Sequence, residues 1–268
     1  MKQDYITRII TGIFSAVAVI IYGCATSPTG QTQLKLVSDS EMTKMGITAY
    51  EEIKKTTPAS KNAKINAYVT CVAKAITHEV PSRTNWELTV FEDKAVNAFA
   101  LPGGKIGVYT GLLDVTENQN QLAAVIGHEI AHVIADHGNA RVSAAYATQT
   151  GLQLTQMIAG AASPEKSHLL GLLGLGAQVG VLLPYGRNQE SEADILGIQY
   201  MARAGFNPAE SVKLWVNMGK ASGGKQPPEL LSTHPSNQTR INDLNNAMPG
   251  AMNLFKQARS SGKKPRCG

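Results

Sequence analysis

The sequence predicts an α+β fold that is mainly helical and carries a small β-sheet. With 43% hydrophobic and 17% charged residues, the chain of 268 residues has the composition of a folded protein and not of a disordered one. In the middle of the chain, short segments that alternate between apolar and polar residues predict strands. From Gln119 onward the spacing of apolar residues is almost everywhere that of helices, and the length suits one domain of moderate size.

The predicted elements begin with two helices, at Asp39–Lys55 and Ser60–Glu79, the second of which has a clear apolar stripe. Apolar residues alternate with polar ones around Trp86–Val90, which predicts a strand. Two more short strands are expected within Asn97–Leu113, on either side of the turn at Pro102–Gly104. The helices of the second half then follow the sheet.

Residues 1–23 have the layout of a secretory signal, with a basic start, the apolar stretch Ile9–Tyr22 and a small residue before Cys24. The apolar stretch is too short for a comfortable membrane span. The ending resembles a bacterial lipobox, in which Cys24 is lipidated and becomes the mature N-terminus. An uncleaved membrane anchor is the alternative. Residues 24–37 are expected to form a flexible tether, and residues 38–268 the folded domain.

Both interpretations of the N-terminus place the folded domain in the bacterial periplasm, attached to a membrane through the N-terminal end of the chain. Ala25 follows the cysteine at the position where an aspartate would signal retention in the inner membrane. We therefore expect a lipid anchor in the outer membrane rather than in the inner one.

The basic character of the chain does not predict a nucleic-acid partner. The formal net charge is +5 and the isoelectric point is about 9.0. However, the lysines and arginines are scattered, without the clusters and interleaved aromatic residues of a nucleic-acid surface. The sequence therefore indicates a mildly basic surface and no binding of nucleic acid.

Two cysteines remain beyond Cys24, namely Cys71 and Cys267. In an oxidising compartment an isolated pair of this kind forms a disulfide, which here would tie the C-terminus to an early helix. Two unpaired thiols are the alternative. The chain has no CxxC motif and no zinc-finger spacing, so we do not expect cysteine to carry the chemistry.

The stretch Leu122–Ala135 is apolar except for His128, Glu129 and His132. Such a helix belongs in the protein interior, where an unpaired carboxylate or imidazole costs several kcal/mol. Because they are four residues apart, His128 and His132 project from one helix face and can bind one ion, while Glu129 beside them can meet a water. This is the HExxH arrangement of zinc peptidases. Core histidines satisfied by backbone groups are the alternative.

A catalytic zinc ion needs a third protein ligand, which we expect at the start of a second helical stretch, Glu190–Asp194. Glu190 would complete a set of two histidines and one carboxylate and leave the fourth position to water. Asp194, one turn further along, would accept a hydrogen bond from the other nitrogen of a ligand histidine. The alternative is an acidic first turn that is favoured by the helix dipole alone.

Together these motifs resemble the gluzincin family of zinc metallopeptidases, which includes the CAAX prenyl proteases, HtpX and the mitochondrial Oma peptidase. The short form with a lipoprotein signal is similar to the periplasmic branch, such as LoiP and BepA. The resemblance rests on His128–His132, Glu190–Asp194, Asn97–Ala100, the run from Gly103 to Gly111, and Thr233–Pro235. It implies a zincin-like metalloprotease domain with one zinc ion on His128, His132 and Glu190, and Glu129 as the catalytic residue.

In the implied mechanism, Glu129 takes a proton from the zinc-bound water and passes it to the departing amine. A second donor is needed for the developing oxyanion, and His234 is the first candidate, followed by Arg240. His234 has two alternative roles: it reaches the open zinc position and keeps the enzyme latent, or it is a surface turn residue. Tyr185 and Arg187 are weaker candidates for lining the cleft.

An extended substrate could pair with the edge of a strand. The candidate residues for this substrate contact are Ile106, Gly107, Val108 and Tyr109. An interior strand without substrate contact is the alternative. A separate segment, Leu169–Leu183, consists of Leu, Gly, Val and Ala with one Gln, and we expect it to form a buried helix. A mobile lid over the cleft or a membrane-contacting helix is the alternative for that segment.

The predicted function is zinc-dependent hydrolysis of peptide bonds in misfolded or misassembled cell-envelope proteins. The hydrolytic chemistry follows from the residues, whereas the quality-control role is implied by the resemblance. The alternative is a non-enzymatic lipoprotein that uses structural zinc and acts as a chaperone or scaffold. The intact Glu129 and the three evident protein ligands argue against it, since structural sites are closed by four ligands. A fourth ligand from His234 would favour it again.

Overall fold

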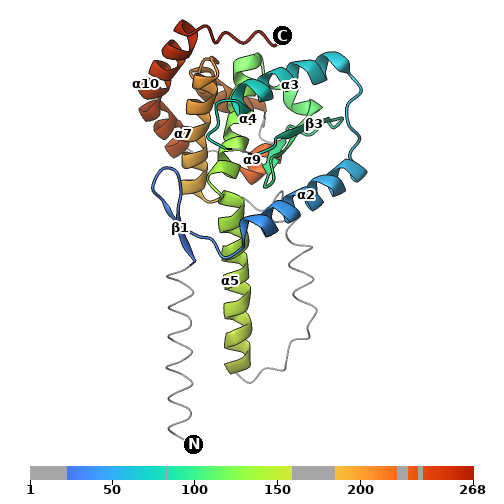
Figure 1. Ribbon diagram of the computed structural model, residues 1–268, viewed down its shortest axis with the longest axis vertical. Helices are drawn as coiled ribbons and strands as arrows, with labels where there is room; N and C mark the ends of the chain where they lie inside the picture. The colour runs from blue at the N-terminus through green and yellow to red at the C-terminus, as the bar shows by residue number, and fades with distance from the viewer. Residues whose placement is uncertain (1–22, 83, 159–184, 222–228, 235–237) are drawn as a thin grey trace, which may run out of the picture.

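The computed structural model describes residues 23–82, 84–158, 185–221, 229–234 and 238–268 (Figure 1). Residues 1–22 of the predicted signal and the segment Leu169–Leu183 lie outside the described residues. In chain order the elements are β1 (Cys24–Thr26), β2 (Thr32–Leu34), α2 (Asp39–Thr56), α3 (Ala63–Thr77), β3 (Glu87–Phe91), β4 (Ala98–Leu101), β5 (Lys105–Tyr109), the 3₁₀ helix η1 (Thr110–Asp114), α4 (Gln119–Ile134), α5 (His137–Ile158), α7 (Arg187–Arg203), α8 (Glu210–Ala221), α9 (Glu229–Thr233) and α10 (Gln238–Ser260).

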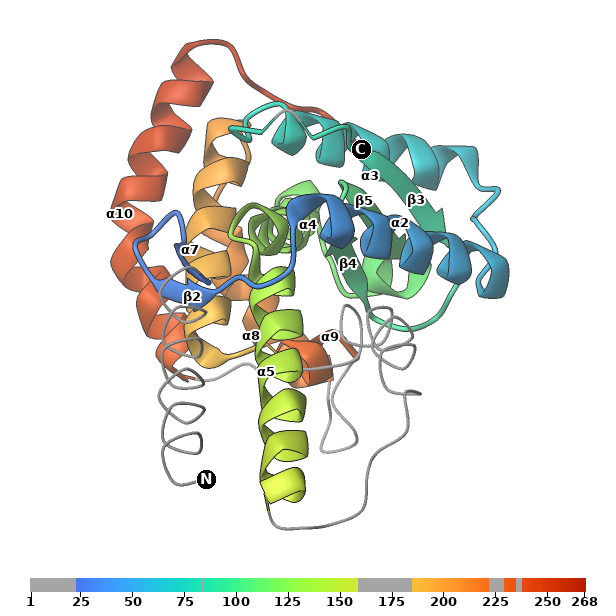
Figure 2. The same cartoon turned by 60° about the horizontal axis from the view of Figure 1, so that its bottom comes forward.

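The architecture is mainly helical with small sheets, so the predicted fold class is confirmed. Helix α4 lies at the centre and packs against α3, α7, α8 and strand β4, while α10 covers the far side of α7 (Figures 1 and 2). Both predicted early helices are present, and the second begins at Ala63, after the N-cap Asn62. Within the described part of the chain, none of the helices is long and apolar enough to cross a membrane.

The three-stranded sheet is buried on both faces, and the alternation of side chains assigns each face to a different helix layer. Phe99 and Leu101 of β4 pack with Tyr50 of α2 in a small aromatic cluster. Ala98 and Ala100 face the opposite way, into the main core that contains α3, α4 and α7. Strand β4 therefore lies directly beside the helix that carries the HExxH motif.

The order of strands corrects one prediction. The sheet order is β3-β5-β4, with β5 parallel to β3 and antiparallel to β4. The predicted substrate strand Ile106–Tyr109 is therefore the central strand, and both of its edges are already paired. The reason is that the turn at Gly103 and Gly104, both with positive φ, folds β4 back on one edge of β5, while the distant β3 takes the other edge.

The segment 24–37 differs from the predicted flexible tether, because its strands β1 and β2 form an antiparallel hairpin that is bound to the domain. Gln33 donates to the carbonyl of Ala135 at 2.7 Å, and the backbone of Leu36 donates to Ser143 at 2.8 Å. Lys35 pairs with Asp136 at 2.7 Å. The polar residues that are typical of a tether thus find their partners at the corner between α4 and α5 and on α5 itself (Figure 2).

Helices α4 and α7 approach each other closely where two glycines meet. A Cβ atom on Gly127 would lie 2.9 Å from the carbonyl oxygen of Gly197, and a Cβ atom on Gly197 would lie 2.9 Å from the backbone nitrogen of His128. Only residues without side chains allow this distance. The crossing brings the HExxH motif of α4 next to the first turns of α7.

The C-terminal end of the chain is tied back to the domain by a disulfide between Cys71 of α3 and Cys267, across a sequence separation of 196 residues. The side chain of Gln119 adds two hydrogen bonds, one from its amide to the carbonyl of Pro265 and one from the backbone of Cys267. In this structure the cysteines take the disulfide alternative, and Cys24 is an exposed free thiol.

We expect Gly197→Ala to lower the free energy of unfolding by about 1–3 kcal/mol, because the new methyl group pushes α4 and α7 apart. Gly250→Ala in α10 is the matched control, since nothing lies within 4 Å of its new Cβ atom. This control should gain about 0.5–1 kcal/mol from helix propensity. Urea unfolding measures both values, and equal stability of Gly197→Ala and the wild type would contradict the close crossing.

Candidate active site

The HExxH residues lie in the fully buried part of α4. The helix begins at the N-cap Asn118, whose side chain accepts hydrogen bonds from the backbone of Asn120 and Gln121. His128, Glu129 and His132 have only 3%, 2% and 1% of their surface exposed. The α4–α7 crossing places Glu190 opposite them, and it is 1% exposed. The three predicted ligands, His128, His132 and Glu190, thus lie together although they come from two helices.

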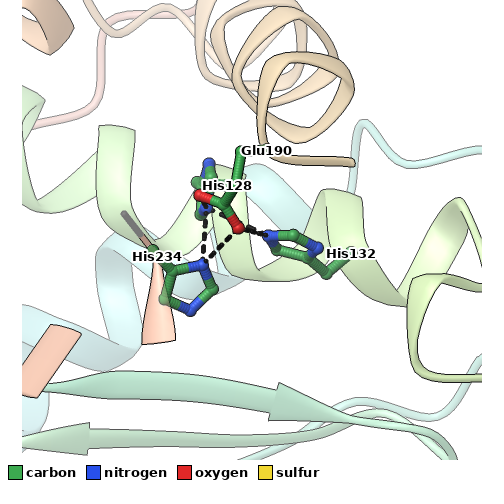
Figure 3. Close-up of side chains that lie close together, drawn as sticks. All are labelled: His128, His132, Glu190 and His234. Atoms are coloured by element: carbon green, nitrogen blue, oxygen red, sulfur yellow. Dashed lines mark hydrogen bonds and ion pairs between the residues drawn. The ribbon is translucent and has the colours of Figure 1, made fainter. Parts of the chain in front are cut away.

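The donor atoms of His128, His132, Glu190 and His234 all lie within 4.8 Å of one another (Figure 3). The Nε2 atoms of the two α4 histidines are 3.1 Å apart, and the Glu190 carboxylate lies 3.4 Å from His132 and 3.6 Å from His128. Two imidazole nitrogens and a carboxylate that converge in the core form a typical donor set for a divalent cation. The residues therefore fit a metal ion.

His234 was predicted near the site in one of three roles, and the structure places it inside the cluster. It follows the short helix α9 and is 3% exposed, so it is not a surface turn residue. Its Nδ1 lies 2.9 Å from Glu190 and 3.1 Å from Nε2 of His128, and its Nε2 lies 3.4 Å from Glu129. The imidazole thus stands between the predicted ligands and the predicted catalytic carboxylate.

Asp194 and Arg240 surround the ligands from outside. Oδ1 of Asp194 lies 2.9 Å from Nδ1 of His128, which is the contact expected for it. Arg240 of α10 donates to both oxygens of Asp194, at 2.7 and 2.8 Å, and its Nη1 lies 2.7 Å from Glu190. The guanidinium also covers the ring of Trp215 at 4.0 Å. These contacts do not support the oxyanion role predicted for Arg240 after His234, because its donors face these two carboxylates and the carbonyl of His234.

The surroundings set the charges of the site. Burial alone would raise the pKa of Asp194, but Arg240 and His128 lower it below its ordinary value. The pKa of Glu190 is lowered too, because hydrogen bonds from His132 and His234 outweigh burial. Burial lowers the pKa of His132 far below its usual range, so this imidazole is neutral. Anionic carboxylates and a neutral imidazole are the forms that bind metal ions.

Glu129 stands apart from these paired groups. Burial raises the pKa of its carboxyl group, and the charges of His234 and His128 and the Ala100 backbone hydrogen bond only partly oppose this. Its Oε1 is buried and has no hydrogen-bond partner among the described residues. A carboxylate with a raised pKa and a free lone pair beside a metal site is suited to accept a proton.

One wall of the site is formed by Tyr185 and Arg141. The ring of Tyr185 stacks on His132 with centroids 3.7 Å apart, and Arg141 of α5 lies 3.5 Å from the Tyr185 ring. Burial raises the pKa of Tyr185 to about 12, so it remains a hydroxyl donor. Arg141 was not predicted, since an isolated arginine gives no signal in the sequence. Arg187 is exposed and does not line the cleft.

Two hollows meet at this wall. A cavity of about 340 Å³ extends from His132 and Tyr185 between α2, the β4–β5 turn and α5. A smaller pocket joins residues 97–100 of the β4 region to Glu129 and His234. A polypeptide that enters along β4 would therefore reach Glu129 directly.

Comparison with known proteins agrees with the resemblance seen in the sequence. The model of peptidase family M48 matches residues 59–248. The chain is similar to the mitochondrial metalloendopeptidase OMA1 of Schizosaccharomyces pombe, with 37% identity over 175 residues that cover 63% of this chain and 49% of that protein. The mitochondrial metalloendopeptidase OMA1 of Bos taurus is 31% identical over 263 residues, covering 89% and 49%. The β-barrel assembly-enhancing protease of Escherichia coli K12 is 29% identical over 210 residues, covering 75% and 42%. The chain spans about half the length of the curated relatives it matches.

We expect Arg240→Met to lower the free energy of unfolding by about 3–5 kcal/mol, because it leaves two buried carboxylates without their cation. Arg259→Met, near the other end of the same helix, is the control. Arg259 is exposed and its guanidinium lies 5.9 Å from the Phe255 ring, so the change should stay within about 0.5 kcal/mol. Urea unfolding at neutral pH separates the two, and equal effects would contradict the role given to Arg240.

Proposed function

Because the chain belongs to peptidase family M48, we propose that the buried cluster binds one zinc ion and that the protein is a zinc-dependent endopeptidase. One observation carries this proposal: the donors of His128, His132 and Glu190 converge beside the buried and unpartnered oxygen of Glu129. Nitrogen and carboxylate ligands in a small closed cluster favour zinc over larger cations. A structural site would have no need of Glu129 as a second carboxylate beside Glu190.

When bound, the zinc ion would supply Lewis acidity, which polarises the scissile carbonyl and lowers the pKa of a water ligand. Glu129 accepts the proton of the attacking water and donates it to the leaving amine, and its raised pKa suits both transfers. Asp194 and Arg240 hold His128 and Glu190 in place from outside. Tyr185 lies in the wall as a hydroxyl donor for the oxyanion, the role for which the sequence predicted His234 first and Arg240 second.

The substrate would lie extended along β4 and not along β5. The edge of β4 opposite β5 borders the pocket that contains Glu129. An extended chain that follows this edge places successive peptide groups at the catalytic carboxylate. This arrangement keeps the β-strand pairing that the sequence suggested and moves it to the neighbouring strand.

His234 supports a latent state of the enzyme. Its imidazole lies 2.9 Å from Glu190 and 3.4 Å from Glu129, between the metal ligands and the general base, where the attacking water belongs. As a fourth ligand it would also suit the alternative function, a non-enzymatic lipoprotein with a structural zinc ion. The buried Oε1 of Glu129, which accepts no hydrogen bond among the described residues, favours the latent peptidase, because burying it without a catalytic task costs stability.

For the biological role, we propose quality control of misfolded or misassembled proteins in the bacterial cell envelope. One relative is named a β-barrel assembly-enhancing protease, which supports this class of substrate. Cys24 is exposed at the first residue of the docked hairpin, accessible for the lipid that the signal-like residues 1–23 suggest. The anchor would lie in the outer membrane, with the domain in the periplasm. Nucleic acid has no place in this proposal.

The general-base role predicts that Glu129→Gln lowers the cleavage rate by about 10²–10⁴ while zinc stays bound. The full chain in detergent is assayed on an unfolded model protein such as casein, with the zinc content measured for each variant. Glu92→Gln, which alters an exposed glutamate, is the matched control and should cleave at the wild-type rate. Equal cleavage by Glu129→Gln and the wild type would refute the mechanism.

The latent state predicts that His234→Ala cleaves the same substrate several-fold faster than the wild type, because the position for the attacking water is freed. The measurement is the initial rate at equal zinc content. A slower rate would instead assign His234 to the oxyanion. Loss of zinc from His234→Ala without any cleavage would favour the structural-zinc alternative.

A further inference from the structure

Each α4 histidine has a second nitrogen that faces away from the cluster, and the two nitrogens have different partners. Nδ1 of His128 meets the carboxylate of Asp194. Nδ1 of His132 lies 2.9 Å from Nδ1 of His137, a residue that is fully buried at the start of α5. The mechanism described so far gives no task to His137.

The contacts continue beyond His137. Its Nε2 lies 3.2 Å from Oε2 of Glu192, which is 1% exposed and belongs to α7. The other oxygen of Glu192 accepts two hydrogen bonds from Thr29, at 3.1 Å from the backbone nitrogen and 2.7 Å from the hydroxyl. Thr29 lies in the turn between β1 and β2. A continuous chain of polar contacts thus joins the N-terminal hairpin to His132.

The contacts assign one direction to the hydrogen bonds of this chain when His137 carries a single ring proton. A carboxylate only accepts hydrogen bonds, so Nε2 of His137 carries the proton that faces Glu192. When His137 carries its one ring proton on Nε2, Nδ1 offers a lone pair to Nδ1 of His132 at 2.9 Å, and His132 is the donor in that contact. His132 therefore keeps a free lone pair on Nε2, the atom that faces Glu190 and His128. This is the tautomer that can bind a metal ion.

We propose that His137, Glu192 and the hairpin turn at Thr29 form a positioning relay that sets the tautomer and orientation of His132. It rests on the proposed zinc site and extends it, because both α4 histidines are then oriented by a carboxylate, His128 directly and His132 through another imidazole. The hairpin is part of the site, although it lies far from it in sequence.

The hairpin is held where the relay needs it. Gln33 bonds the carbonyl of Ala135, two residues before His137, and Lys35 pairs with Asp136, the residue between them. Asp136 has a positive φ of 55°, which turns the chain from α4 into α5 and directs His137 back toward His132. The same hairpin therefore braces both the corner that carries His137 and the carboxylate that orients it.

Glu192→Gln is the sharpest test. The backbone N–H of Thr29 can only donate, so the amide oxygen of the new glutamine must face Thr29 and its NH₂ group must face His137. His137 then takes the opposite tautomer, and His132 is forced to carry its proton on Nε2. We expect zinc affinity to fall by about 10–100-fold. NMR of nitrogen-labelled histidine should show the tautomer of His132 reversed, whether or not zinc is present.

Thr29→Val and Thr29→Ser test the hairpin separately, at a partly exposed position where neither change threatens the fold. The valine variant should release zinc faster than the wild type and shift the visible spectrum of the cobalt-loaded protein, and the serine variant should restore both. Gln31→Ala, which removes a bond from the same turn to the backbone of Asn188, is the control and should change neither.

Two results would overturn the relay. One is a Glu192→Gln protein with unchanged His132 tautomer and zinc affinity. The other is a Thr29→Val protein whose zinc release and cobalt spectrum equal those of Thr29→Ser. Failure of the proposed peptidase is recognised independently, since it is the absence of cleavage by both the wild type and the His234→Ala variant. The NMR measurement of the His132 tautomer does not depend on cleavage, so the relay and the peptidase activity are tested separately.

Discussion

The close crossing of α4 and α7 at Gly127 and Gly197 is the constraint on which the rest of the molecule depends. The ligands come from two helices that are about sixty residues apart in the chain, and only a crossing without side chains brings their polar faces into contact. Once the helices touch there, Glu190 must face His132, and Asp194 must face His128. Geometry that looks specific to the metal site is thus a product of backbone packing.

The crossing also creates an electrostatic problem, because it buries several carboxylates in one core. Different neighbours compensate the charge of each carboxylate. Arg240 neutralises Asp194 and Glu190 from α10, the histidines share the charge of Glu190, and Glu192 faces the opposite side of α7 toward the hairpin. Glu129 has a weaker counterpart, since its Oε1 lies 3.4 Å from Nε2 of His234 and accepts no hydrogen bond among the described residues. This least balanced carboxylate is the one to which we assign the proton transfer.

Helix periodicity was sufficient to place His128 and His132 on one face with Glu129 beside them. Glu190, on another helix, was predicted from the need for a third ligand and from the resemblance. The bounds of α2, α3 and the strands β3, β4 and β5 were also predicted to within a few residues, whereas β1 and β2 were not predicted. Sequence periodicity does not contain the pairing partners of a strand, so β5 was taken for an edge. Likewise, a polar segment such as residues 24–37 reads as a tether, because the groups that bind it lie more than 100 residues further along the chain.

The docked hairpin has a consequence for where the enzyme could work. A flexible linker would let the domain move over a wide range of distances from its anchor. A hairpin that begins at Cys24 and is hydrogen-bonded to α5 and α7 allows little such movement. With the lipid proposed for Cys24, the catalytic cleft would stand at a fixed height above the bilayer. Polypeptides would then be selected by their proximity to the membrane surface before the cleft recognises any of their side chains.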